Sequence, residues 1–418
     1  MRTLIITAAF VAAYGLSTAS AADLRMSWWG SEDRHIATQE ALKFCGDKFG
    51  HTIAPEMTGW TGHQEKIATQ LAGRTEADIM QINWPWLSIF SKSGDGFADL
   101  NQFKDIIDLG QWSEADRKSG SVNGKLNGLP VSITGRVFMF NKTTYDQAGL
   151  AIPTTWDELF AAAPVMKQRL GPDYYPFEGN GPEARLLVIL RTTQKTGKDL
   201  IDPVTQQVAW TVEELAESLD FYQSMVEQGA VRSWRDEVAG GNVPLHESPE
   251  WASGKIAGTY QWSSTYNKIV APMLEGQQLV PVEMLRVDGA TTEGIYRKPS
   301  MLFAISKYSK EPKAAAEIIN CLLNDPEAID KLGATRGVPS SKVALEALTG
   351  TGSIEPAQIE ANRIVMQSTG VDVSPLNEHP RVTEAFDSTL EAFAYGQLNA
   401  ETAAAGIIGR INSILTGI

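Results

Sequence analysis

The stretch of residues 128–159 restricts the possible folds of this chain more than any other part of the sequence. After an initial turn, an apolar run over residues 131–140 predicts one strand. Strands in globular proteins usually have about five or six residues, so a strand this long can begin in one globular unit and end in another. Gly135 interrupts the run and is the point where we expect the strand to bend. Arg136 would then lie at the floor of a cleft between the two units.

The length of the chain also predicts two units. A chain of 418 residues exceeds the size at which one hydrophobic core usually splits, about 250–300 residues. No long flexible linker interrupts the sequence, so strand crossings rather than a tether must join the two lobes. We predict a signal peptide over residues 1–21, a first lobe over 22–133 and 300–335, and a second lobe over 134–299 and 336–418, with a further crossing at 335–339.

The N-terminus has the pattern of a cleaved export signal. Arg2 gives a positive start, residues 4–16 are mostly apolar, and Ala19, Ser20 and Ala21 fit a small-residue cleavage site. The apolar part is too short to span a membrane, and no later run reaches the roughly 18 apolar residues that a spanning helix needs. The sequence therefore predicts a soluble product that is exported to the periplasm and cleaved near Ala21.

The charge and the cysteines narrow the class of protein further. The net charge is −14 at pH 7, whereas nucleic acids and anionic membrane surfaces are bound by basic surfaces. We therefore predict no nucleic-acid partner. The two cysteines, Cys45 and Cys321, allow either one disulfide or two buried free thiols in an oxidising compartment.

Strand and helix patterns alternate after the signal, which predicts an α/β domain with a mostly parallel sheet. Three predicted strands, near residues 24–28, 53–57 and 77–82, each end in a short run that carries tryptophan and polar groups. In open α/β sheets, ligands bind beyond the carboxyl ends of the strands. We therefore expect Trp29, Trp60 and Trp84 to gather at one edge of the first lobe.

Several motifs together resemble those of a known family. They are Gly128-Leu129-Pro130, Phe140-Asn141-Lys142, Ala148-Gly149-Leu150, the Pro153-to-Leu159 run Pro-Thr-Thr-Trp-Asp-Glu-Leu, Trp251-Ala252-Ser253-Gly254-Lys255, and Asn324-Asp325-Pro326 followed by Gly337-Val338-Pro339. The chain is similar to extracellular solute-binding protein family 1, the carbohydrate-binding subunits of ABC importers, which include maltose-binding protein.

The resemblance implies a periplasmic binding protein fold, in which two α/β lobes joined by hinge strand crossings enclose a ligand cleft. It also implies capture of a carbohydrate by lobe closure, a monomeric protein, and an ABC permease in the inner membrane as partner. The strand ends are similar to one branch of the family, which takes up oligogalacturonides. That narrower resemblance implies an acidic, uronate-type oligosaccharide. The alternative is a neutral or otherwise charged sugar.

Sugar recognition needs flat apolar faces against the pyranose ring and planar polar groups for its hydroxyls. A carboxylated sugar would in addition be held by arginine, whose planar fork engages a carboxylate through two hydrogen bonds. Trp156, at the start of a predicted helix, is assigned to the core. The predicted ligand-binding residues are Trp29, Arg34, His35, Trp60, His63, Asn83, Trp84, Arg136, Asn180, Arg185, Trp262, Ser263, Arg297 and Arg336.

Searches for catalytic and metal-binding motifs give no match. The sequence contains no phosphate-binding loop, no His-Glu-x-x-His, no Gly-x-Ser-x-Gly and no Cys-x-x-Cys. Five scattered histidines and two distant cysteines argue against a zinc site. We predict a protein without enzymatic activity, metal or cofactor. A periplasmic glycan hydrolase or lyase is the enzyme alternative, because paired carboxylates cannot be recognised from spacing alone. A binding protein coupled to a chemoreceptor would leave the same sequence pattern.

Overall fold

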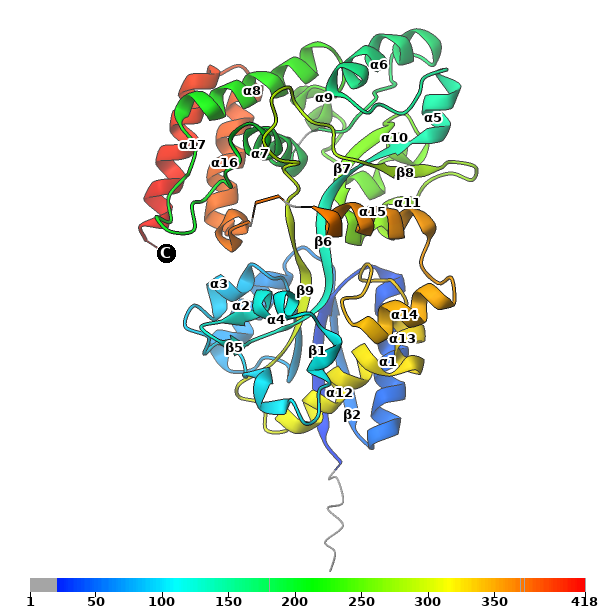
Figure 1. Ribbon diagram of the computed structural model, residues 1–418, viewed down its shortest axis with the longest axis vertical. Coiled ribbons are helices and arrows are strands. Elements are labelled where there is room, and N and C mark those ends of the chain that lie inside the picture. The colour runs from blue at the N-terminus through cyan, green and yellow to red at the C-terminus, as the bar shows by residue number, and fades with distance from the viewer. Residues whose placement is uncertain (1–20, 180, 369, 372, 418) are drawn as a thin grey trace, which may run out of the picture.

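The computed structural model describes residues 21–417 except 180, 369 and 372. The chain forms two α/β lobes, one above the other, with two strands running side by side between them (Figure 1). The predicted signal peptide lies almost entirely outside the described residues. None of the helices in the described part of the chain combines the length and the apolar character needed to cross a membrane.

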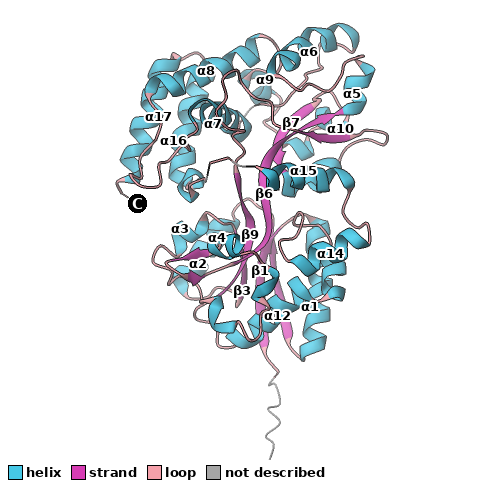
Figure 2. Ribbon diagram, in the orientation of Figure 1, coloured by secondary structure: helices cyan, strands magenta, loops and turns pink. Residues whose placement is uncertain are grey.

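The sheet of the first lobe is built from strands separated widely in sequence. β1 (Asp23–Trp29) runs parallel to β2 (Thr52–Thr58) and to β3 (Ile79–Ile82). β9 (Arg297–Ile305) then adds to β3 in the antiparallel direction. The prediction of a mostly parallel sheet is therefore wrong, because β9 enters this lobe from the other one and arrives in the opposite direction (Figure 2).

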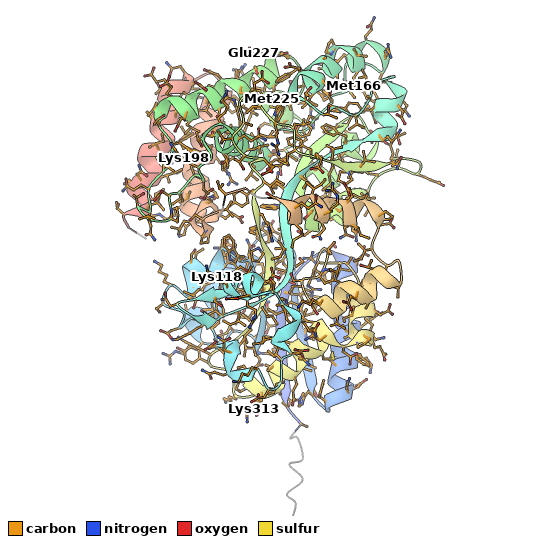
Figure 3. The ribbon with its side chains drawn as sticks, in the orientation of Figure 1. Lys118, Met166, Lys198, Met225, Glu227 and Lys313 are labelled. Carbon is orange, nitrogen blue, oxygen red and sulfur yellow. A yellow bond between two sulfur atoms is a disulfide. The ribbon has the colours of Figure 1, made fainter. Side chains whose placement is uncertain are left out.

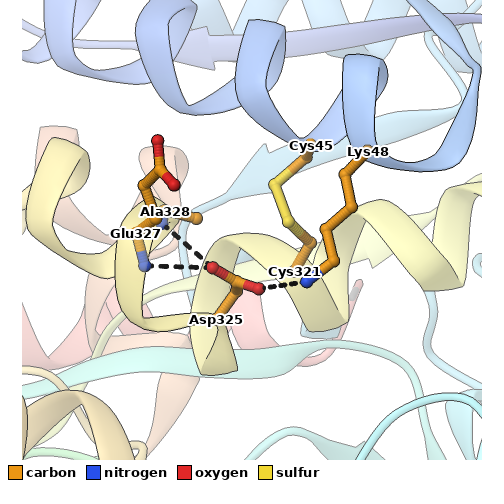
Figure 4. Close-up of a disulfide and its surroundings, with 6 residues drawn as sticks. All are labelled: Cys45, Lys48, Cys321, Asp325, Glu327 and Ala328. Carbon is orange, nitrogen blue, oxygen red and sulfur yellow. Dashed lines mark hydrogen bonds and ion pairs between the residues drawn. A yellow bond between two sulfur atoms is a disulfide. The ribbon is translucent and has the colours of Figure 1, made fainter.

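Helices cover this sheet, and a disulfide fixes two of them together. α1 (Glu32–Phe49) packs against α12 (Pro312–Asn324) and α13 (Pro326–Leu332). Cys45 on α1 and Cys321 on α12 form a disulfide with a Cα–Cα distance of 6.0 Å (Figure 4). Beside it, Lys48 pairs with Asp325 at 2.5 Å, and the Asp325 carboxylate caps the start of α13. The structure therefore shows one disulfide rather than two buried free thiols.

The shorter elements of the first lobe lie between its main strands and helices. They are α2 (His63–Gly73), α3 (Trp86–Phe90), η1 (Leu100–Phe103), η2 (Leu109–Gln111), α4 (Glu114–Ser119), β4 (Ser121–Val122), β5 (Lys125–Leu126) and α14 (Lys342–Gly350).

The long strand predicted at residues 131–140 is β6 (Leu129–Asn141), and all 13 of its residues are buried. Its first half pairs with β9, and its second half pairs with β7 (Gly258–Trp262) and β8 (Leu279–Val282). Leu129 and Val131 belong to the hydrophobic core of the first lobe, whereas the residues from Ile133 onward belong to that of the second. The prediction that this strand crosses between two units is confirmed.

The prediction that the strand bends at Gly135 stays a prediction, and the structure gives this glycine a further role. The pairing of β6 with β9 is irregular between Pro130 and Ile133, which precedes Gly135. Gly135 is a point of close approach, because a Cβ atom there would lie 2.9 Å from Cγ2 of Val365 on α15 (Pro356–Gln367). A side chain at this position would push α15 away from the crossing strands.

The second lobe is mainly helical. Thr155 caps α6 in a capping box with Glu158, and Met166 and Met225 lie in the core between α6 and α8 (Figure 3). The elements are α5 (Lys142–Gln147), α6 (Trp156–Arg169), α7 (Pro182–Thr196), α8 (Val212–Glu227), α9 (Trp234–Ala239), η3 (Leu245–Glu247), α10 (Pro249–Ala252), η4 (Ser263–Thr265), α11 (Tyr266–Val270), α15, η5 (Pro375–Glu378), α16 (Pro380–Ala394) and α17 (Ala400–Leu415).

The predicted lobe boundaries stay a prediction, and the packing suggests one change to them. The segment 335–340 lies beside β6, where the Ser340 N–H donates to the Val131 carbonyl at 2.9 Å. The chain then continues into α14, which contacts α13 of the first lobe. We propose that the third passage between the lobes follows residue 350 and leads into α15, rather than lying at residue 335.

Candidate functional site

Four rings gather at the carboxyl ends of β1, β2 and β3. The centroid of the Trp29 ring lies 5.3 Å from that of Trp60, 5.4 Å from that of His63 and 5.5 Å from that of Trp86. Trp60 is 53% exposed, whereas the other three rings are buried. We call these four residues the tryptophan platform. It presents one accessible aromatic face on a rigid base, which is the arrangement that a sugar ring requires.

The structure brings Trp29 and Trp60 together as expected but leaves Trp84 out of the platform. The chain turns immediately after β3, since the Trp86 N–H donates to the carbonyl of Asn83 at 3.0 Å. This turn directs the Trp84 indole elsewhere, and its Nε1 donates to the carbonyl of Ser119 at 2.9 Å. The sequence analysis did not name Trp86, which lies two residues after Trp84 in the same loop.

The two histidines predicted to bind ligand support the platform and its neighbours. His63 is fully buried, and its Nδ1 lies 2.6 Å from Oγ1 of Thr58. Burial, followed by the nearby Lys66 charge, lowers the pKa of His63 to about 4, so the ring is neutral at pH 7. His35 is only partly buried, and its Nδ1 accepts a hydrogen bond from the Trp28 indole at 3.0 Å.

A hydrogen-bonded chain joins the platform to two arginines. The Trp29 carbonyl accepts from Nη1 of Arg34 at 3.2 Å and from Nε2 of Gln81 at 3.1 Å. Oε1 of Gln81 in turn accepts from Nε of Arg336 at 2.8 Å, and Arg336 also donates to Thr38 at 2.8 Å. These contacts fix both guanidinium groups beside the end of β1.

Neither guanidinium has an acidic partner. Within the described part of the chain, no carboxylate lies within ion-pair distance of Arg34 or Arg336. Arg34 also donates to the Thr335 carbonyl at 2.8 Å, so its partners are backbone oxygens. Burial lowers the pKa of Arg34 to about 10, while burial and the Arg34 charge lower that of Arg336. One Nη of the buried Arg336 makes no hydrogen bond.

A second group of cations lies around Trp262, at the end of β7. Nζ of Lys298 lies 4.7 Å and Cζ of Arg136 5.2 Å from the centre of the Trp262 ring. Unlike Arg34 and Arg336, these two cations form ion pairs with carboxylates. Lys298 pairs with Glu378 at 2.6 Å, and Arg136 with Glu183 at 3.3 Å. Sequence reasoning missed Lys298 and named only its neighbour Arg297 as a candidate.

The remaining predicted residues divide between the second lobe and the part of the chain that is not described. Arg185 pairs with Asp387 at 2.8 Å. Ser263 is buried, and its hydroxyl lies 3.2 Å from that of Thr134 on β6. Arg297 is partly buried at the start of β9. Asn180 lies outside the described residues. The ligand-binding roles of all these residues stay predictions.

The two groups flank the same segment of β6. Ser132 donates to the Arg336 carbonyl at 2.6 Å, and Arg136 follows four residues later on the strand, a separation of about 13 Å. Loop and helix contacts also join the lobes here. A Cβ atom on Gly337 would lie 2.8 Å from Cβ of Ser264, and α3 contacts η5. No group of three or more His, Cys, Asp or Glu side chains in the described ranges is arranged to hold a metal ion.

Two α/β lobes joined by shared strands, with an aromatic face and cations where they meet, define a two-lobed binding protein. The chain belongs to the bacterial extracellular solute-binding protein family, whose family model matches residues 40–362. This result confirms the family resemblance and the periplasmic binding protein fold.

Solved structures cover almost the whole chain. A periplasmic solute-binding protein from Pectobacterium atrosepticum is 36% identical, with 95% of this chain and 99% of that chain covered and a TM-score of 0.90. A periplasmic oligogalacturonide-binding protein from Yersinia enterocolitica, in complex with saturated digalacturonic acid, is 35% identical, with the same coverage and a TM-score of 0.89.

Curated relatives are more distant. The diacetylchitobiose binding protein DasA of Streptomyces coelicolor is 24% identical over 321 residues, which are 72% of this chain and 69% of that protein. A putative binding protein of Brucella abortus is 30% identical over 175 residues, and the match spans only 41% of its length and 40% of this chain.

Proposed function

We propose that this protein captures a negatively charged carbohydrate of the uronate-oligosaccharide class between its lobes and delivers it to an ABC permease in the membrane. The observation that supports this proposal most strongly is the pair formed by Arg34 and Arg336. Both guanidinium groups are held in place by neutral oxygens, and neither has an acidic partner among the described residues.

Electrostatics give this pair a preference for an anion. Arg336 is buried and Arg34 is partly buried, and two like charges in such surroundings destabilise each other unless a counter-charge is supplied. Protonated arginine cannot relieve this by losing its proton under ordinary conditions. A ligand carboxylate beside Arg34 would provide this counter-charge. A hydrogen bond to a charged group contributes about 1.5–3 kcal/mol.

The tryptophan platform supplies the second requirement, an apolar face for the ring of a sugar. Trp60 is exposed over half of its surface and is fixed from beneath by Trp29 and Trp86. An aromatic face that is already ordered loses little conformational entropy when a ring packs on it. The platform and the arginine pair share the Trp29 backbone, so one saccharide can contact both.

Lobe closure follows from placing such a ligand at the meeting point of the lobes. A ligand that contacts both lobes has a higher affinity for the closed state, and that difference in affinity shifts the equilibrium toward closure. The family, the digalacturonic acid complex of the Yersinia relative and the predicted signal peptide support a periplasmic location and transfer to a permease. We further propose that the protein is a monomer without enzymatic activity. A relative that binds diacetylchitobiose makes a neutral sugar the alternative ligand.

Isothermal titration calorimetry with digalacturonate and with a neutral disaccharide tests the ligand class. We expect binding of digalacturonate with an affinity that falls as salt is added, and at least about tenfold weaker binding of the neutral sugar. Tight binding of only the neutral sugar would overturn the acidic assignment. Release of reducing ends or unsaturated products from oligogalacturonides would overturn the assignment as a binding protein.

A matched pair of variants tests whether digalacturonate binding depends on Arg34. Arg34→Met removes an unpaired guanidinium, whereas Arg363→Met removes an exposed one that pairs with Glu283 and Glu360 on the surface. We expect Arg34→Met to weaken digalacturonate binding by at least about tenfold and Arg363→Met to leave it unchanged. Arg34→Lys, which keeps the charge but loses the planar fork, should lie between them. Equal affinities for all three variants would refute the role of Arg34.

A further inference from the structure

A buried histidine lies beside the point where the chain enters the first lobe, and the ligand site does not involve it. His51 directly precedes β2, and its side chain is only 2% exposed. Nε2 of His51 lies 2.9 Å from Oε2 of Glu317 on α12, and Nδ1 lies 3.2 Å from the backbone nitrogen of Ala22. Ala22 directly precedes β1, at the end of that strand that points away from the second lobe (Figure 1). The histidine therefore joins the start of β1 to α12, at the opposite end of β1 from the tryptophan platform.

The backbone determines the direction of both hydrogen bonds. A backbone N–H can only donate, so Nδ1 of His51 accepts from Ala22. The ring proton then lies on Nε2 and is donated to the Glu317 carboxylate. The chain of donors thus runs from the Ala22 nitrogen, through the imidazole ring, to a negative charge. Hydrogen bonds in such a chain become stronger when the group at the donor end carries a positive charge.

Glu317 supplies a negative charge that no lysine or arginine balances. In the described part of the chain, neither type of side chain lies within ion-pair distance of the Glu317 carboxylate, which is 31% exposed and has His51 as its partner. The nearby Asp325, in contrast, pairs with Lys48 at 2.5 Å. An ammonium group has N–H donors and a positive charge. His51 and Glu317 together offer what such a group requires, an acceptor nitrogen and a negative charge behind it.

The cleavage site predicted from the sequence lies at this same backbone nitrogen. Ala19, Ser20 and Ala21 fit the small-residue pattern, so hydrolysis would fall between Ala21 and Ala22. Exposure changes at the same bond, because Ala21 is exposed whereas Ala22 is only 5% exposed. Ala22 is also held on its other side, since its carbonyl accepts from the Thr52 N–H at 2.9 Å. The bond to be cut therefore lies where the chain enters the folded lobe, and the nitrogen that follows it is already fixed in place.

We propose that His51 and Glu317 bind the α-ammonium group of the mature chain, which signal-peptide cleavage creates at Ala22. Hydrolysis breaks the bond between the Ala21 carbonyl carbon and the Ala22 nitrogen. The hydroxyl of a water molecule is added to that carbon and the remaining hydrogen to that nitrogen. A free α-amino group has a pKa of about 7.7–8.0, so most of it takes up a further proton at pH 7.

The new ammonium group fits the space that cleavage leaves. One of its N–H groups keeps the hydrogen bond to His51, while the others face the side from which the exposed Ala21 has departed. These N–H groups reach water, which limits the cost of placing a charge beside the core. Processing thus gives the first lobe an attractive charge interaction with Glu317 that the longer chain lacks. The inference is independent of which carbohydrate the protein binds.

N-terminal sequencing and thermal melts of chains with different first residues test this site. Chains that begin at Ala22 and at Ala21, each released from an N-terminal fusion by a protease that leaves no extra residue, differ in where the amine lies. We expect the protein recovered from the periplasm to begin at Ala22. We also expect the Ala22 chain to melt at least about 3 °C above the Ala21 chain at pH 7. Equal melting temperatures, or a mature chain that begins elsewhere, would overturn the proposal.

A substitution of the acid shows whether the difference arises at this site. Glu317→Gln removes the charge, whereas the control Glu327→Gln removes an exposed carboxylate that pairs with Lys331 on the surface of α13. We expect Glu317→Gln to reduce the melting difference between the two chains to less than about 1 °C and Glu327→Gln to retain it. A melting difference that persists in Glu317→Gln would refute the role of this carboxylate.

Chemical labelling gives a second readout that does not depend on overall stability. Acetic anhydride reacts with the unprotonated amine, and a neighbouring carboxylate lowers the unprotonated fraction about tenfold for each unit by which it raises the pKa. Mass spectrometry of the Ala22 chain should therefore show N-terminal labelling at least about tenfold faster in Glu317→Gln than in Glu327→Gln, with equal labelling of lysines. Equal N-terminal labelling rates in the two variants would contradict the proposal.

Discussion

Replacing Cys45 and Cys321 by alanine will destabilise the first lobe and leave the second nearly unaffected. The disulfide joins α1 to α12, and both helices belong to the hydrophobic core of the first lobe. The two cysteines are separated by 276 residues, and that long loop contains most of the second lobe. The crosslink therefore restricts the unfolded first lobe, whether or not the second lobe is folded.

The magnitude follows from the entropy of loop closure. A loop of 276 residues corresponds to about 5.6 kcal/mol in the chain-entropy description. If the second lobe stays folded, it bridges most of this loop, and a flexible remainder of about 100 residues corresponds to about 4.7 kcal/mol. Measured losses are usually smaller, so we expect about 3–5 kcal/mol. For a lobe of this size, that loss lowers the melting temperature by about 6–20 °C.

Differential scanning calorimetry of the double alanine variant and of the reduced parent measures this loss. Both should show a low-temperature transition for the first lobe and an unchanged transition for the second. Lys48→Met, which removes the exposed half of the neighbouring ion pair, should shift neither transition by more than a degree or two, about 0.5 kcal/mol. A loss below about 1 kcal/mol, or equal shifts of both transitions, would refute the reasoning.

Three further predictions concern single residues. Gly135→Val should lower the free energy of unfolding by about 1–3 kcal/mol in chemical denaturation, because its side chain would collide with Val365; unchanged stability would contradict this. Trp60→Ala should weaken ligand binding about tenfold in calorimetry, yet change stability by less than about 1 kcal/mol, because this ring is half exposed. The parent should lose stability as the pH falls from 6.5 to 4, because unfolded His63 takes up a proton that the folded form, with a pKa of about 4, does not. Urea titrations of His63→Gln should lack this part of the pH dependence, and identical pH profiles would contradict the assignment.

The sequence predicted the order of elements well where periodicity determines it. The first three strands appear near their predicted positions. The crossing strand was recognised from its length. The direction of β9 could not be predicted, because a strand pattern does not say from which lobe the chain arrives. The sequence also could not predict that the chain stays in the first lobe and forms α14. Nothing in residues 335–340 distinguishes a segment that crosses to the second lobe from one that only packs beside β6.

The site was predictable only as separate pieces. The positions of Trp29 and Trp60 could be predicted because both residues lie at the carboxyl ends of their strands. Whether Trp84 or Trp86 joins them depends on the turn after Asn83. Charge balance was not predictable at all. Lys298 meets an acid 80 residues further along the chain, while Arg34 and Arg336 come together from positions about 300 residues apart. Which arginine is free and which is neutralised is therefore a property of the tertiary structure.

The late arrival of β9 has a consequence for how the protein is made. During synthesis, β3 exists long before β9, so its outer edge has no partner while the part of the second lobe that precedes β9 is being added. An open strand edge invites pairing with other chains. The first lobe cannot close this edge until residue 305 has been made, nor gain its disulfide until residue 321 has followed. For this reason the earliest part of the chain is among the last to become native, and the nascent protein depends on being shielded from aggregation during that interval.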